Sequence, residues 1–329
     1  MLRSFNDTHP RSPRFRRRLF AAAGLTLGIS GAIGAASGSI GSVDEPKNMA
    51  SGPLAAALPT VDALPVDVNE RVQFWIERFS TDERGTFETF MSREGVYGDL
   101  IRGKLLERGM PEELLFLAMI ESGFSPSATS HVSAVGLWQF MGPTARQYGL
   151  RVDEWVDERR DPVRATDAAL EYLQWLHDRY DSWYLAAAAY NAGPARVDRA
   201  LRRRAADTES DADLYWAIIE HLPRETRQHV PRMLAFTFLA RNADRYGFEI
   251  TQAGPYAFDR VWVPGGTPLR VVARALDVPT RELRELNPHL VRGVTPPGGS
   301  FGLRVPPGGT ASVVASIGGG PWGSVGDDD

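Results

Sequence analysis

The chain has 329 residues, 43% of them hydrophobic and 24% charged, which allows one sizeable folded domain and a smaller one. The formal net charge is −4, but residues 1–36 carry six arginines and one aspartate, which leaves −9 on the rest. A nucleic-acid-binding protein needs a basic face, so this acidic remainder excludes that class.

Composition also limits the chemistry. The chain has no cysteine, which excludes disulfides, thiolate metal sites and cysteine nucleophiles. The six histidines lack the His-Glu-x-x-His spacing of zinc enzymes. We therefore expect neither a metal ion nor any other cofactor.

The N-terminal segment has the pattern of an export signal. Arginines precede an uncharged run from Leu19 to Val43, and Gly34-Ala35-Ala36 provides the small residues typical of a cleavage site. We expect residues 1–36 to direct export to the periplasm or cell envelope. The alternative is that residues 19–40 stay as a membrane anchor, since the run approaches the ~20 residues that span a bilayer. Residues 37–68, rich in Gly, Ser, Pro and Ala, are predicted to be a flexible linker.

From Asn69 to about residue 250, apolar side chains recur at helical spacing, and no long strand-like alternation interrupts them. This pattern predicts an all-helical domain over residues 69–250. The helical pattern begins at residue 69 and is continued by residues 87–91. Further helices are expected over 97–108, 114–121, 163–180, 183–190, 197–201, 213–220 and 224–245.

Glu121 stands out within this domain. It ends the apolar run Leu114–Ile120 and is followed by Ser122-Gly123-Phe124. Burial against apolar surface disfavours the charged form of a carboxylic acid, so such a group keeps a proton near neutral pH. A general acid acting on a glycosidic oxygen needs this property. The alternative is a solvent-facing glutamate at a helix end, with Gly123 as the stop signal.

The C-terminal part changes character. Residues 260–263 and 301–305 have β-type sequences, and the segments 269–276 and 280–286 between them are helical in pattern. We predict a small β-α-α-β module over residues 256–308, and a tail over 309–329 with too little apolar content to fold. The fold class is therefore mainly α, with one small mixed module.

Several sequence blocks occur together in the helical part: Glu121-Ser122-Gly123-Phe124, Gly136-Leu137-Trp138-Gln139-Phe140-Met141, Ala189-Tyr190-Asn191-Ala192-Gly193-Pro194, and the segments 157–162 and 222–227. In this order and spacing they resemble the lytic transglycosylase family with the goose-lysozyme-like catalytic domain, specifically the membrane-bound lytic transglycosylase D type. The resemblance implies an exported enzyme whose partners are peptidoglycan glycan strands.

The resemblance also implies a mechanism. Such enzymes cleave the β-1,4 bond between N-acetylmuramic acid and N-acetylglucosamine, and the sugar's own 6-hydroxyl takes the place of water. The product carries a 1,6-anhydromuramyl end. Glu121 matches the single catalytic residue, acting first as acid and then as base. A second catalytic carboxylate is not required, and Asp157 and Asp161 are interpreted as helix caps and surface ion-pair partners.

The same matches assign further site residues. Tyr190 matches the tyrosine whose hydroxyl orients the catalytic carboxylate, although a buried helix also favours an aromatic core residue there. Ser130 and Gln139 match sugar-contacting residues, with a loop role and backbone bonding as their alternatives. Met141, Ser122, Asn191 and Glu225 complete the set. For these four, gap filling, backbone capping or anchoring of a helix start remain alternatives.

The C-terminal module resembles a LysM carbohydrate-binding module, through Val263-Pro264-Gly265-Gly266-Thr267, Leu286-Asn287-Pro288 and Leu303-Arg304-Val305-Pro306. It departs from the pattern at Gly266, where Asp is usual, and at Pro268. These changes lie in the loop expected to meet the sugar. The module is therefore either a glycan-binding unit or a degenerate one that packs on the catalytic domain.

Two other functions remain open at this stage. A lysozyme-type muramidase on the same fold would use water in place of the 6-hydroxyl. A non-catalytic peptidoglycan-binding protein would keep the fold and lose the chemistry, although the presence of Glu121, Tyr190 and Gln139 disfavours it.

Overall fold

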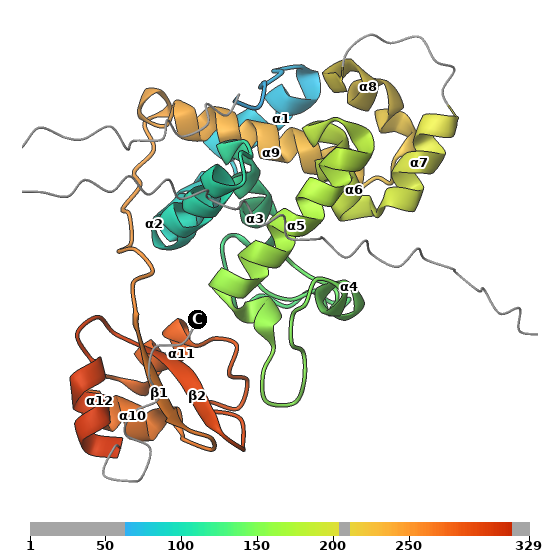
Figure 1. Ribbon diagram of the computed structural model, residues 1–329. Coiled ribbons are helices and arrows are strands. Elements are labelled where there is room, and N and C mark those ends of the chain that lie inside the picture. Colours follow the sequence, from blue (N-terminus) through green and yellow to red (C-terminus); the bar gives the residue numbers. More distant parts are fainter. Residues whose placement is uncertain (1–62, 204–210, 318–329) are drawn as a thin grey trace, which may run out of the picture. The chain divides into compact units, whose positions relative to one another are not determined.

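A computed structural model describes residues 63–203 and 211–317 of the chain. Within these ranges the protein is mostly helical, with one two-stranded sheet near the C-terminus (Figure 1). The predicted fold class, mainly α with a small β-α-α-β unit, is confirmed. The predicted signal over residues 1–36 lies outside the described residues, as does most of the predicted linker. Leu64, near the end of that linker, is only 4% exposed and belongs to the main core.

The helical part has one hydrophobic core, which α9 crosses. Its side chains from Val230 to Leu239 are almost all buried, and it packs against α1, α3 and α6 (Figure 1). The four consecutive alanines of α6 let helices approach closely, because they add little side-chain volume. The helices are α1 (Glu70–Ser80), α2 (Arg84–Glu107), α3 (Leu115–Ser122), α4 (Gly142–Gln147), α5 (Pro162–Tyr180), α6 (Trp183–Ala192), α7 (Pro194–Arg202), α8 (Asp211–Ile218) and α9 (Thr226–Arg241).

Helix α2 corrects one prediction. The sequence favours separate helices at 87–91 and 97–108, but one helix of 24 residues spans both. Gly95 lies within it because the later chain passes there: a Cβ on Gly95 would lie 2.9 Å from the carbonyl oxygen of Ala253. The glycine thus reflects a close backbone approach and does not end the helix.

The C-terminal unit has its own core. Strands β1 (Asp259–Pro264) and β2 (Ser300–Val305) pair antiparallel, with Val261 opposite Leu303. Helices α10 (Leu269–Leu276) and α11 (Thr280–Leu286) connect them, and α12 (Thr310–Ile317) follows β2 (Figure 1). Helix α12 shows that the tail prediction is wrong for residues 310–317, since Val313 completes the apolar cluster and is 1% exposed. Residues 318–329 lie outside the described part.

A buried ion pair joins this unit to the helical part. Asp161 caps α5 by accepting the backbone N–H groups of Val163 and Arg164. Arg304 of β2 donates to both oxygens of Asp161, at 2.8 Å each. Both side chains are about 95% buried, so the predicted surface position of Asp161 is wrong. Burial raises the pKa of Asp161, but the charges of Arg304 and His289, together with hydrogen bonds from Arg304 and the backbone N–H of Arg164, outweigh it and hold the pKa below its usual value.

The loop before α5 strengthens this junction. Val156 lies in the core of the C-terminal unit and forms a β-bridge with Leu290. The backbone N–H of Asp157 donates to the carbonyl of His289 at 2.9 Å, and Arg292 pairs with Glu154. Asp157 is also buried, against the surface position predicted for it. The loop is therefore packed into the module.

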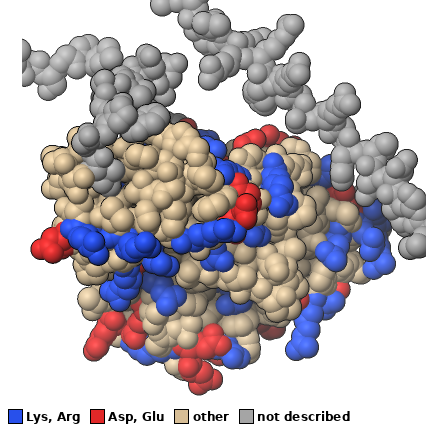
Figure 2. Space-filling model, turned by 90° about the horizontal axis from the view of Figure 1, so that it is seen from below, with Lys and Arg blue, Asp and Glu red and all other residues tan. Residues whose placement is uncertain are grey.

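The described surface carries charges of both signs. On the face shown in Figure 2, basic side chains gather in a band, with acidic side chains beside them and uncharged surface around them. Within residues 63–203 and 211–317, we find no helix with the length and apolar character to cross a bilayer. The same residues contain no cluster of three or more His, Asp or Glu side chains suited to holding a metal ion.

Candidate active site

Glu121 lies in the last turn of α3, whose first five residues are buried. Gly123 ends the helix in the left-handed conformation at φ 59°, and its N–H donates to the carbonyl of Met119 at 2.7 Å. A Cβ at this position would lie 2.3 Å from the ring of Phe90, so only glycine fits. The turn leaves Glu121 at the edge of the core, with 15% of its side chain exposed.

His229 of α9 contacts Glu121 directly. Its Nε2 lies 2.8 Å from the Oε1 atom of Glu121, and its side chain is 8% exposed. Among the described residues, no group bonds to the other ring nitrogen, Nδ1. The sequence analysis missed His229, because a lone histidine on a buried helix has no distinguishing pattern. The one available signal was its position four residues after Glu225, on the same helical face.

One turn further along α9, Arg232 adds positive charge to the site. Its guanidinium lies 5.0 Å from the ring centre of Trp75. Burial lowers the pKa of Arg232, and the negative charges of Glu83, Glu121 and Glu225 oppose that shift. This partly buried cation therefore lies close enough to Glu121 for the two charges to interact.

Tyr190 lies in the last turn of α6, close enough to Glu121 for its charge to act on the tyrosine. Its hydroxyl donates to the backbone carbonyl of Trp138 at 2.7 Å. Burial raises the pKa of Tyr190 well above its usual value, and the negative charge of Glu121 raises it further. Tyr190 therefore lies near Glu121, but its hydroxyl donates to the backbone of Trp138 and not to the carboxyl. Its predicted orienting role on the carboxylate stays a prediction.

Ser122 ties α3 to the segment 136–141. Its hydroxyl lies 2.8 Å from the carbonyl of Leu137 and 3.1 Å from that of Ala118. Gln139 has φ 48° and donates from its side-chain amide to the carbonyl of Gly136 at 2.8 Å. Ser130 accepts the N–H of Ala134 at 3.0 Å. All three candidate sugar contacts therefore have backbone partners that fix their positions.

The segment 127–141, which carries two of these residues, is held by hydrogen bonds from the loop before α5. Arg159 donates to the carbonyls of Ser133 and Phe140, and Arg160 donates to the carbonyl of Ser127. A Cβ on Gly136, at φ 87°, would lie 1.7 Å from the carbonyl oxygen of Arg159. The loop therefore fits against Gly136 without room for a side chain.

The remaining predicted residues surround this arrangement. Met141 precedes α4 and is 42% exposed. The side-chain oxygen of Asn191 accepts the hydroxyl of Thr226 at 2.7 Å, which links α6 to the start of α9. Glu225 is exposed and makes no side-chain capping bond at the start of α9. Asn191 thus contacts another helix, whereas Met141 and Glu225 leave surface for a ligand.

The loop that departs from the LysM pattern is also ordered. Thr267 is 9% exposed, and its N–H donates to the hydroxyl of Thr295 at 2.8 Å. Gly266 is exposed with φ 77°, and a Cβ there would meet open space. The loop is therefore held by a bond from Thr267, and Gly266 leaves open space at the position where Asp is usual.

Two parts of the chain match models of known protein families. Residues 101–212 match the family model described as the transglycosylase SLT domain. Residues 257–316 match the model described as lytic transglycosylase MltD, LysM-like domain. Residues 101–212 are thus similar to the SLT transglycosylase domain, and residues 257–316 are similar to the LysM-like domain of the MltD type. The predicted family resemblance is confirmed.

Two curated relatives and one solved structure are similar to parts of the chain. The chain is 38% identical over 189 residues to membrane-bound lytic murein transglycosylase D of Escherichia coli (strain K12), covering 57% of this chain and 41% of that protein. It is 29% identical over 147 residues to the soluble lytic murein transglycosylase of the same organism, covering 43% and 22%. The solved structure of a 70 kDa soluble lytic transglycosylase from Escherichia coli aligns with a TM-score of 0.37 and 27% identity, covering 45% of this chain and 24% of that one. The matched part of this chain thus spans about two fifths of the length of transglycosylase D from Escherichia coli.

Proposed function

We propose that the protein is a peptidoglycan lytic transglycosylase that cleaves the MurNAc-β-1,4-GlcNAc bond through Glu121. The observation that carries the proposal is a single half-buried carboxyl, held at 2.8 Å by His229, in an SLT domain. Its relatives named as lytic murein transglycosylases support the same substrate class.

In the first step, protonated Glu121 gives its proton to the glycosidic oxygen, and the bond from that oxygen to C1 of the muramic acid residue breaks. The N-acetylglucosamine chain leaves with the proton. Glu121 is now a carboxylate, which the donors and positive charge on α9 stabilise: His229 at its oxygen and Arg232 nearby.

In the second step, the Glu121 carboxylate removes the proton from the 6-hydroxyl of the same muramic acid. The freed oxygen forms a bond to C1, which closes the 1,6-anhydro ring and restores the carboxylic acid. Ser130, Gln139 and Met141 hold the glycan in this proposal, on the segment fixed by Ser122 and Arg159. Tyr190 keeps that segment in place through Trp138.

A lysozyme-type hydrolase is the weaker candidate. It requires a second carboxylate to activate water or to form a covalent intermediate. The acids considered for this role have other partners: Asp161 pairs with Arg304, and Asp157 pairs with Arg159 at 2.8 Å. Neither carboxylate has a free approach to a sugar.

The enzyme is proposed to act in the cell envelope, on the periplasmic side. The export pattern of residues 1–36 and the relative named as membrane-bound support this location. Attachment through residues 19–40 is part of the proposal. It is tested by fractionating cells that express the full chain and by sequencing the N-terminus of the mature protein.

The chemistry is tested by mass spectrometry of muropeptides released from purified peptidoglycan, with Glu121→Gln as the matched variant. We expect 1,6-anhydromuramyl products from the native protein only, with the variant still binding the sacculus. Reducing-end muramic acid would instead mean hydrolysis. An active variant, or an inactive native protein that binds the sacculus, would refute catalysis by Glu121.

A further inference from the structure

A cavity is lined by the residues that follow Glu121 closely in the sequence. It has a volume of about 460 Å³, and Phe124, Ser125 and Pro126 form one of its walls. The wall continues with Arg93 of α2, which donates through Nη1 to the carbonyl of Gly123 at 3.2 Å. The same short segment therefore lines this cavity and ends the helix that carries Glu121.

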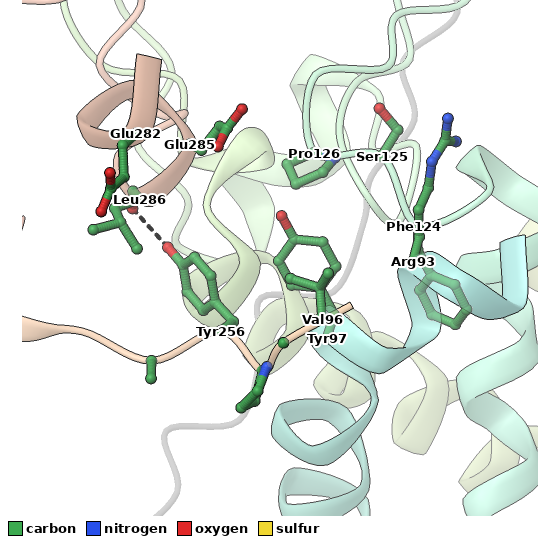
Figure 3. A pocket seen from close by; sticks show the side chains of 13 residues that line it. Arg93, Val96, Tyr97, Phe124, Ser125, Pro126, Tyr256, Glu282, Glu285 and Leu286 are labelled. Carbon is green, nitrogen blue, oxygen red and sulfur yellow. Dashed lines mark hydrogen bonds between the residues drawn. The ribbon is translucent and has the colours of Figure 1, made fainter. Parts of the chain in front are cut away.

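The opposite wall comes from the C-terminal module. Glu282, Glu285 and Leu286 of α11 face the cavity, and Tyr97 and Tyr256 lie between the two walls (Figure 3). The tyrosine rings are 5.4 Å apart, and the hydroxyl of Tyr256 donates to the carbonyl of Leu286 at 2.6 Å. The cavity is thus acidic on the module side and aromatic between the walls.

The two walls are held together. The backbone N–H of Tyr256 donates to the carbonyl of Val96 at 2.8 Å, and Arg304 donates to the hydroxyl of Tyr256 at 3.0 Å while it pairs with Asp161. A site whose walls are already fixed loses little conformational freedom when a ligand binds. Burial raises the pKa of Tyr97 to about 12, and the negative charge of Glu285 adds to the shift, which places that charge close to the tyrosine.

The charges define the ligand class. Two glutamates on one helical face suit a primary ammonium group, the guanidinium of Arg93 suits a carboxylate, and the tyrosines suit an aliphatic chain between them. In the described residues no carboxylate pairs with Arg93, and the partner of Glu285 is the exposed Arg281 at 3.3 Å. A ligand can therefore reach both kinds of charge.

We propose that this cavity binds the stem peptide of the substrate, through the free amine and carboxylate of a diamino-acid residue. The inference rests on the proposed function, because peptidoglycan carries such peptides on its muramic acid. Ser125 follows Glu121 by four residues, so their Cα atoms are at most ~15 Å apart. An extended peptide of five residues spans up to ~17 Å. A peptide on a muramic acid held at Glu121 is therefore long enough to reach the wall of the cavity that Ser125 forms.

The test compares intact glycan strands with strands whose stem-peptide amines have been acetylated. We expect the native enzyme to show a KM about fivefold lower on the amine-bearing strands, an effect on the order expected of a few partly exposed charge pairs. Glu282→Gln with Glu285→Gln is expected to remove the difference and to leave kcat unchanged.

Asp99→Asn with Glu107→Gln is the matched control. It changes the net charge equally at two exposed positions of α2 that do not line the cavity, and it keeps the preference. The proposal is overturned if the native enzyme does not distinguish the two kinds of strand, or if the Glu282/Glu285 variant still does.

A second measurement separates this result from the proposed activity. Binding of the soluble stem tripeptide, with a free amine or an acetylated one, is followed by calorimetry on the full protein. If no strand is cleaved, the proposed activity fails, but amine-dependent peptide binding that is lost in the Glu282/Glu285 variant would still support the cavity. Absence of such binding would overturn the peptide site while leaving any observed cleavage intact.

Discussion

At the residue scale, the site depends on how one carboxyl is held while its charge changes. In the proposed mechanism Glu121 donates a proton and later accepts one, so its neighbours have to tolerate both states. His229 offers one ring nitrogen at 2.8 Å, and Arg232 adds a positive charge that burial prevents from being fully solvated. These two α9 side chains are therefore expected to control the rate more than the affinity.

His229→Phe is expected to lower kcat by ten- to a hundredfold with little change in KM, because the carboxyl loses its positioning contact. His229→Gln keeps a polar group at a similar reach and should recover part of the rate. Steady-state kinetics on glycan strands give the split between kcat and KM, with melting temperatures as the folding control. Equal kcat in the native and Phe proteins would remove His229 from the mechanism.

At the element scale, the segment 127–141 is shaped by the loop before α5. Arg159 and Arg160 donate to three of its carbonyls, and the backbone at Arg159 occupies the space beside Gly136. The glycan contacts predicted on this segment have few apolar anchors of their own. Their geometry thus depends on a neighbouring loop.

Gly136→Ala tests this dependence, with Gly149→Ala as its control. Both glycines have positive φ, at 87° and 75°, but only at Gly136 does a Cβ meet the backbone, since nothing lies within 4 Å at Gly149. Gly149→Ala should cost about 1–2 kcal/mol from backbone strain alone. Gly136→Ala should cost clearly more and raise the KM for glycan strands. Urea denaturation and kinetics check both, and similar losses in the two variants would contradict the clash.

At the scale of the whole described molecule, the C-terminal module is joined to the catalytic part by buried polar groups. Asp161, Arg304 and His289 meet there, with His289 Nδ1 at 3.3 Å from Asp161. Burial lowers the pKa of His289 from 6.5 to about 4, although the Asp161 charge opposes the shift and Arg304 and Arg260 reinforce it. The junction therefore keeps a neutral imidazole under mildly acidic conditions.

This predicts a pH dependence of stability. Between pH 6.5 and 4 the unfolded chain binds a proton at His289 that the folded chain does not, so unfolding becomes easier as the pH falls through this window. The contribution is about 1.4 kcal/mol per pH unit, or roughly 3 kcal/mol over the window. Denaturation curves at pH 7 and pH 4.5 measure it, with His289→Phe as the comparison. The same pH dependence in both proteins would exclude His289 as its source.

Much of the fold could be read from local patterns. The apolar periodicity gave α10 and α11 at their observed bounds, and the Asp161-Pro162 cap and proline placed the start of α5 within one residue. These features depend on neighbours three or four residues apart. Local patterns did not show that α2 continues through Gly95, which lies against residue 253, or that residues 310–317 form α12, whose Val313 belongs to a core built from distant strands.

The sequence by itself determined the family, the helical class and the candidate acid, because these rest on short blocks whose order survives without knowledge of the fold. It also predicted Tyr190 and Gln139 as parts of the same site, which stays a prediction. Only the tertiary structure paired Glu121 with His229, 108 positions apart, and Asp161 with Arg304, 143 positions apart. Such pairs depend on helix packing and burial across the whole chain, and no periodicity within one segment carries that information.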